Sequence, residues 1–143
     1  MFAKQLTVFI ENRTGRLSEV LSVLKDSGVN ILSMSLADTT EFGLLRLIVN
    51  DAAKGRETLN DKGFTSLLSD VSIIQIPHKV GALQELLKVI DERGVNIDYM
   101  YGLSVENDKA YVVLKASDLA SVDKILAELH IGTLSEEDLL KLQ

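Results

Sequence analysis

Residues 14–31 read TGRLSEVLSVLKDSGVNI, and residues 80–97 read VGALQELLKVIDERGVNI. The two stretches align without a gap when Gly15 is paired with Gly81, and each has a glycine near its start and Gly-Val-Asn-Ile at its end. Identity at a fixed offset over so short a span indicates an internal repeat. The chain of 143 residues is therefore predicted to contain two related domains, residues 1–70 and 71–143.

Apolar periodicity predicts the same order of elements in both domains. Apolar residues alternate along residues 4–12, as in a half-buried strand, and recur every three or four positions along residues 16–26, as in an amphipathic helix that Gly28 ends. The other predicted elements are strands at 30–38, 44–51, 64–71, 72–78, 96–105, 109–117 and 131–135, helices at 52–63, 83–90 and 120–130, and a terminal acidic helix that starts at Ser135.

Each domain is thus predicted to have the order βαββαβ. This order gives an antiparallel four-stranded sheet with two helices on one face, the ferredoxin-like plan. A single unit of this size buries a marginal core. We therefore predict an α+β fold of two tandem ferredoxin-like units whose antiparallel sheets pack side by side.

Composition narrows the function. The chain is 46% hydrophobic and 25% charged, with a net charge of −6 and no cysteine. An acidic chain is not expected to bind nucleic acid or an anionic membrane, because both attract basic proteins. Thiolate metal sites are excluded, no apolar run reaches the roughly 18 to 20 residues that span a bilayer, and the first residues do not resemble a signal peptide. A cytoplasmic protein is expected.

No catalytic motif is apparent, so we expect a non-enzymatic protein without a cofactor. The chain has no phosphate-binding Gly-x-x-x-x-Gly-Lys loop and no cluster of histidines and carboxylates at metal-ligand spacing. A small-molecule phosphatase on this fold would need an arginine in its first loop, which Arg13 or Arg16 could supply. Their counterparts in the second domain are Lys79 and Ala82, which weakens this alternative.

The repeated strand, loop, glycine and helix resemble the signature of ACT domains, a family of amino-acid-binding regulatory modules. The resemblance rests on IENRTGRLSEVLSVLKDSGVNI at 10–31 and IPHKVGALQELLKVIDERGVNI at 76–97, and the two copies cover nearly the whole chain. The arrangement is similar to small bacterial proteins made of two ACT domains with no enzyme attached. The proline that usually precedes the glycine is replaced by Thr14 and Val80.

Elementary chemistry also favours an anionic ligand at each junction. A helix start leaves backbone N–H groups unpaired, and the helix dipole adds partial positive charge there, so a carboxylate fits. A glycine admits a ligand close to the backbone, and the amide of Asn12 offers both a donor and an acceptor. The resemblance implies that the asparagine of Gly-Val-Asn-Ile reaches a ligand held by a neighbouring domain. The candidate ligand-binding residues are Asn12, Arg13, Thr14, Gly15, Arg16, Leu17, Asn30, Ile31, His78, Lys79, Val80, Gly81, Ala82, Leu83, Asn96 and Ile97.

The candidates also have structural interpretations, which stay open at this point. The glycines could serve only a tight turn, and the two asparagines could only satisfy backbone groups after the helix. His78 could be a solvated loop side chain, His130 is expected to be structural, and the basic residues Arg13, Arg16 and Lys79 are most simply surface charges.

The leading hypothesis is an amino-acid sensor. It would hold a free amino acid between ACT domains, form a homodimer, and shift between domain or subunit arrangements on binding. A regulated enzyme could be its partner. The alternative is a structural or protein-interaction module that has lost the ligand. The sequence names neither the amino acid nor the number of loops that bind it.

Overall fold

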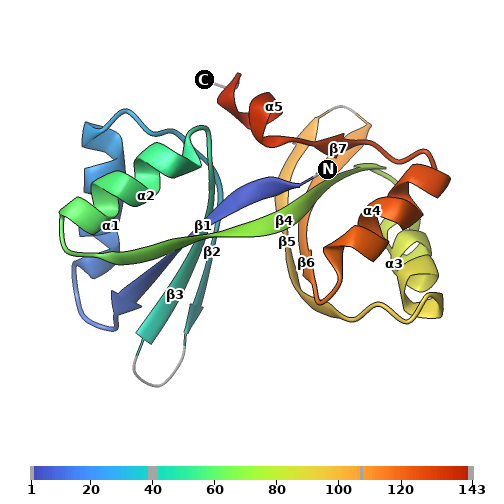
Figure 1. The fold of residues 1–143 in the computed structure, drawn as a ribbon, viewed down its shortest axis with the longest axis horizontal. Helices are drawn as coiled ribbons and strands as arrows, with labels where there is room; N and C mark the ends of the chain where they lie inside the picture. Colours follow the sequence, from blue (N-terminus) through green and yellow to red (C-terminus); the bar gives the residue numbers. More distant parts are fainter. Residues whose placement is uncertain (1, 39–41, 107, 142–143) are drawn as a thin grey trace. The chain divides into compact units, whose positions relative to one another are not determined.

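The computed structural model describes residues 2–38, 42–106 and 108–141, which form two compact units (Figure 1). The N-terminal unit contains Lys4–Ser69 together with the end of the chain from Asp138. The C-terminal unit contains Asp70–Glu137 together with the start of the chain up to Ala3. The predicted boundary between residues 70 and 71 stays a prediction, and the repeat gives no signal for this grouping of the chain ends.

The N-terminal unit is a sheet with two helices on one face (Figure 1). Its sheet order is β2-β3-β1-β4, with antiparallel pairing of β1 with β3 and of β2 with β3. The elements are β1 (Ala3–Glu11), α1 (Arg16–Asp26), β2 (Ile31–Asp38), β3 (Phe42–Val49), α2 (Ala52–Asp61) and the first part of β4 (Thr65–Pro77).

The C-terminal unit repeats this order with the later part of β4 as its first strand. β4 lies between β6 and the two-residue β7, and β5 pairs with the other side of β6, all antiparallel. The elements are α3 (Ala82–Glu92), β5 (Ile97–Glu106), β6 (Lys109–Ala116), α4 (Leu119–Glu128), β7 (Thr133–Leu134) and the terminal α5 (Glu136–Leu140). The predicted α+β fold of two tandem ferredoxin-like units is confirmed.

One predicted break is wrong. The strands expected at 64–71 and 72–78 form a single strand of 13 residues, β4. The break was expected because the repeat divides the chain there, but residues 65–76 contain no glycine or proline that would interrupt pairing, so the extended backbone continues.

Each unit has its own apolar core between sheet and helices. In the N-terminal unit, alternate residues of β1 and the α1 residues Val20 and Leu24 are almost completely buried. Leu86 and Ile90 of α3 occupy the same positions in the core of the C-terminal unit. The predicted amphipathic character of α1 is therefore correct, except that Leu21, one of the regularly spaced apolar residues of 16–26, is not part of the core and lines a surface hollow. In the described ranges, no helix combines the length and apolar composition needed to cross a membrane.

Candidate functional site

The two junctions between first strand and first helix have the same backbone hydrogen bonds. The N–H of Arg13 donates to the carbonyl of Glu11 (2.8 Å), and the N–H of Arg16 donates to the carbonyl of Arg13 (3.4 Å). Both bonds recur at the matching positions of the second copy, from Lys79 (3.1 Å) and Ala82 (3.2 Å). The sequence repeat is thus a repeat of one turn.

The backbone conformation of each junction requires a glycine. Gly15 has φ 90° and Gly81 has φ 85°, in the left-handed region that residues with a Cβ avoid. A Cβ added to either glycine would meet no heavy atom within 4 Å. The structural interpretation of the glycines is therefore correct as far as the turn is concerned, and the turn also leaves open space beside each helix start.

Neither first helix has a side-chain cap. Gly15 and Gly81 occupy the N-cap positions of α1 and α3, and a glycine has no side chain that could accept a hydrogen bond from the N–H groups of the helix. The N–H groups of the second and third residues of each helix consequently lack a capping side chain, and backbone N–H groups at a helix start attract anions.

The second helix of each unit begins differently. The carboxylate of Asp51 accepts from the N–H of Lys54 (3.2 Å) at the start of α2. At the start of α4, the carboxylate of Asp118 accepts from the N–H (3.1 Å) and hydroxyl (2.6 Å) of Ser121. The Ser121 hydroxyl, and then its N–H, hold the pKa of Asp118 below its ordinary value. The second helices thus carry their own carboxylates, whereas the first helices leave that position free.

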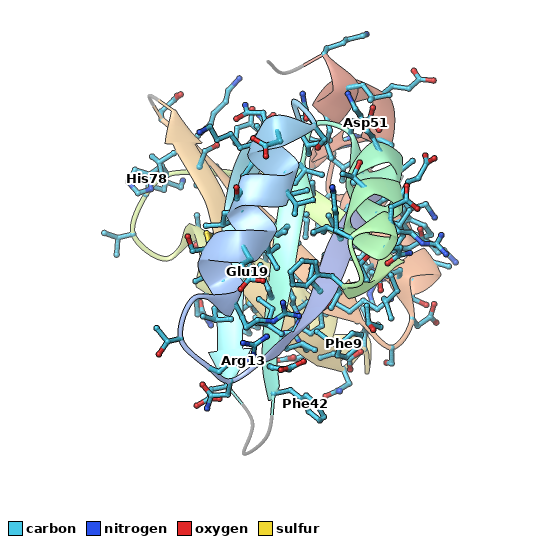
Figure 2. The ribbon with its side chains drawn as sticks, turned by 90° about the vertical axis from the view of Figure 1, so that its left-hand side faces the viewer. Phe9, Arg13, Glu19, Phe42, Asp51 and His78 are labelled. Atoms are coloured by element: carbon cyan, nitrogen blue, oxygen red, sulfur yellow. The ribbon has the colours of Figure 1, made fainter. Side chains whose placement is uncertain are left out.

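Basic side chains at the N-terminal junction interact with nearby acids. Arg13, seen below the start of α1 in Figure 2, pairs with Glu11 (Nε to Oε2, 2.9 Å), and both side chains are exposed. Arg16 pairs with Glu19 (Nη1 to Oε2, 2.7 Å). Its guanidinium lies 4.3 Å from the centre of the Phe64 ring, and its side chain is only 16% exposed.

The prediction of surface charge is therefore correct for Arg13 and wrong for Arg16. The side chain of Arg16 is largely covered, and its guanidinium lies over the ring of Phe64, a contact that sequence periodicity does not reveal. Since both arginines pair with glutamates, neither is positioned as the free phosphate ligand that a phosphatase would need.

The C-terminal junction has different side chains on the same turn. His78, Lys79 and Val80 are exposed, and His78 projects from its loop (Figure 2). The N–H of His78 donates to the carbonyl of Asp108 (2.6 Å), so the backbone of this residue has a structural role. Ala82, at the position of Arg16, is buried.

The asparagines after the first helices use their backbone groups in hydrogen bonds. The N–H of Asn30 donates to Oδ1 of Asn50 (2.9 Å), and its carbonyl accepts from the N–H of Asn50 (3.0 Å). The carbonyl of Asn96 accepts from the N–H of Ser117 (3.2 Å), and its side-chain amide donates to Asp98 (3.4 Å). Both asparagine residues are exposed, and Ile31 and Ile97, which follow them, are half-buried.

Within a unit, the glycine junction and the asparagine lie at opposite ends of a helix. α1 has 11 residues, which corresponds to about 16 Å. Accordingly, Asn12, Arg13 and Leu17 line one hollow of about 290 Å³, while Asn30 and Ile31 line another of about 400 Å³. One small ligand cannot bridge both groups of residues within the same unit.

The candidate residues of the C-terminal junction line an open hollow of about 630 Å³. Lys79, Gly81 and Leu83 contribute to it, as do Gln84, Lys88 and Asp91, which the sequence analysis missed. Helical spacing from Gly81 would have found these three residues, because positions three and four apart share a helix face.

The hollow beside the N-terminal junction also contains residues that the sequence analysis missed. Glu11 and Asp38 add two carboxylates to its lining. Asp38 ends β2 opposite Gly43 of β3, so finding it required the register of this strand pair.

The repeated geometry agrees with a match of the whole chain, residues 1–143, to the family described as ACT domain pair. The chain belongs to this family.

Solved structures show the same fold. This ACT domain pair is similar to protein BT0572 from Bacteroides thetaiotaomicron, with 38% identity, a TM-score of 0.93, and 99% of this chain and 98% of that chain covered. It is also similar to the regulatory subunit of aspartate kinase from Thermus thermophilus, with 14% identity, a TM-score of 0.65 and 89% of both chains covered. No curated protein matches the chain.

Proposed function

We propose that this ACT domain pair is a non-enzymatic regulatory protein that binds a free amino acid at its glycine junctions. The observation that supports this most is the pair of identical first-helix starts without side-chain caps. In the same fold, the second-helix starts hold the carboxylates of Asp51 and Asp118. A ligand carboxylate would play the same part at the first helices.

The hollow of about 630 Å³ at the C-terminal junction has the charges that an amino acid requires. A ligand carboxylate is favoured by the backbone N–H groups of Leu83 and Gln84 and by the ammonium groups of Lys79 and Lys88. The carboxylate of Asp91 favours the ammonium group of the ligand. A few charge-assisted hydrogen bonds of about 1.5 to 3 kcal/mol each, reduced by the entropy of binding, correspond to millimolar to micromolar affinity. This range suits a sensor of free amino acids.

A neighbouring ACT unit would complete the site. Since Asn30 and Asn96 lie about a helix length from the glycine of their own unit, each would reach a ligand held by another unit, in the same chain or in a second chain of a homodimer. A ligand shared in this way stabilises the arrangement it contacts best. We place this activity in the cytoplasm, with a regulated enzyme as its partner.

The direct test is a thermal-shift and calorimetric screen of the full chain against the common amino acids. At least one amino acid should raise the melting temperature, and a lack of response to all of them would contradict the proposal. Gly15→Val and Gly81→Val then show which junctions bind. Gly63→Val is the matched control, because Gly63 has φ 89° and open space around it but lies outside both junctions. It should lower stability without changing the response to the ligand.

The alternative, a protein-interaction module without a ligand, also has support. Arg13 and Arg16 pair with glutamates near the N-terminal junction, which leaves fewer polar groups for a ligand there. In that case the screen would find no ligand, and the glycine substitutions would change stability alone.

A further inference from the structure

The space beside the first residue of the first helix is filled by a side chain in the N-terminal unit and is open in the C-terminal unit. In the N-terminal unit it holds the guanidinium of Arg16, which lies over Phe64 and pairs with Glu19. Arg16 is the first residue of α1, and Ala82 is the first residue of α3. The open place thus has an alanine where the filled place has an arginine.

The position of Phe64 is also occupied by a smaller residue. The N–H of Phe64 donates to the carbonyl of Leu59 (3.0 Å) after α2, and the N–H of Ile131 donates to the carbonyl of Leu126 (2.9 Å) after α4. These bonds identify Ile131 as the counterpart of Phe64. The C-terminal unit therefore has at this place neither the guanidinium nor the aromatic ring on which it would stack.

A hollow of about 290 Å³ lies at this place in the C-terminal unit. Its lining includes Ala82, Glu85 and Ile131, together with the apolar residues Pro77, Leu86 and Leu129. The volume is close to the lower end of the range for small-molecule sites. It suits a ligand about as large as the side chain that fills the other unit.

Glu85 gives this hollow its chemical preference. Its counterpart Glu19 pairs with Arg16, but no cation within the described ranges forms an ion pair with Glu85, and Lys79, which lines the same hollow, forms none with it. Glu85 is exposed, so the preference comes from the combination of its carboxylate with the apolar lining beside it. A guanidinium is weakly hydrated and can pair with Glu85 while the chain that carries it lies in the hollow.

We propose that this hollow binds a small molecule with a guanidinium group on a short aliphatic chain. The guanidinium would lie beside Ile131 and donate to the carboxylate of Glu85, as the guanidinium of Arg16 lies over Phe64 and pairs with Glu19 in the other unit. The aliphatic chain would lie against the apolar residues of the lining. This hollow adjoins the one at the glycine junction and shares Lys79 with it, but the proposed ligand needs no carboxylate, so its binding can be tested separately from amino-acid binding.

The test uses n-propylguanidinium, which reproduces the arginine side chain without its backbone, and n-propylurea, its uncharged counterpart. In an NMR titration of the ¹⁵N-labelled full chain, n-propylguanidinium should shift the amide signals of Glu85 and Ile131 saturably and leave those of Glu19 and Phe64 unchanged. n-Propylurea should bind at least about tenfold more weakly, because it cannot form a charged pair. No saturable shifts, or equal binding of both compounds, would overturn the proposal.

Three substitutions separate occupancy of the hollow from surface charge. Ala82→Arg should fill the hollow, abolish the saturable shifts and raise the melting temperature. Ala120→Arg makes the same substitution at an exposed position of α4 that lines neither hollow, so binding should persist. Glu85→Gln, at an exposed position that should fold normally, should reduce the affinity for n-propylguanidinium to that for n-propylurea. Undiminished binding to Ala82→Arg or Glu85→Gln would contradict the proposed site.

Discussion

The two junctions share a backbone and differ in what surrounds it. Each has the same turn, with a left-handed glycine before an uncapped helix. At the N-terminal junction, Arg13 and Arg16 pair with glutamates (2.9 Å and 2.7 Å). At the C-terminal junction, Lys79 and Ala82 stand in their places and leave open hollows. The turn is thus common to both copies, and differences in binding must come from side chains.

The largest expected effect is the loss of Arg16. Arg16→Ala should reduce the free energy of unfolding by about 2 kcal/mol, because it removes a stacked guanidinium, its covered stem and an ion pair. Urea unfolding followed by circular dichroism measures this loss. A change of less than about 0.5 kcal/mol would mean that the filled and open places do not differ in energy.

A smaller loss of stability than that of Arg16→Ala, and the same loss at both junctions, is expected when either junction glycine is replaced. Gly15→Ala and Gly81→Ala should each cost about 1 to 2 kcal/mol, since both impose a left-handed conformation on a residue with a Cβ. Gly102→Ala is a control, because Gly102 does not have a positive φ and an added Cβ would meet nothing within 4 Å. Unequal losses at the two junctions would show that their backbones are not equivalent.

The repeat predicted what the two junctions share, because identical residues specify identical turns. The offset that pairs Gly15 with Gly81 also places the first helices and the asparagines correctly. After the hairpins the offset between the two copies is one position longer. The cap of α2 is Asp51, and the matching cap of α4 is Asp118 and not Ser117. A comparison at a fixed offset therefore does not pair Phe64 with Ile131.

The difference between the junctions required the structure. The stacking of Arg16 on Phe64 joins the start of α1 to the chain beyond α2, and periodicity within one element carries no information about such contacts. The hollow beside Asn12 likewise depends on Asp38, which strand register brings there.

The exposed pair at the N-terminal junction should matter least among the substitutions there. Arg13→Ala should change the free energy of unfolding by less than about 0.5 kcal/mol, because exposed ion pairs contribute little. The same urea experiment measures it beside Arg16→Ala. A loss as large as that of Arg16→Ala would mean that the exposed pair with Glu11 organises the turn.

The smallest effect concerns the carboxylate that caps a second helix, because Asp118 lies at the surface, where solvent screens its charge. Hydrogen bonds from Ser121 lower the pKa of Asp118 below its ordinary 3.8. A lowered folded-state pKa means that the cap contributes its full stability above pH 3.8 and loses it as the pH falls through the lowered value.

Carboxyl ¹³C titration of Asp118 should give a midpoint below 3.8. Ser121→Ala should move the midpoint back up, because the hydroxyl is the largest cause of the shift. A midpoint that Ser121→Ala leaves unchanged would show that the backbone N–H groups at this helix start are sufficient to hold a carboxylate in its charged form, which is also what the uncapped first helices would offer a ligand.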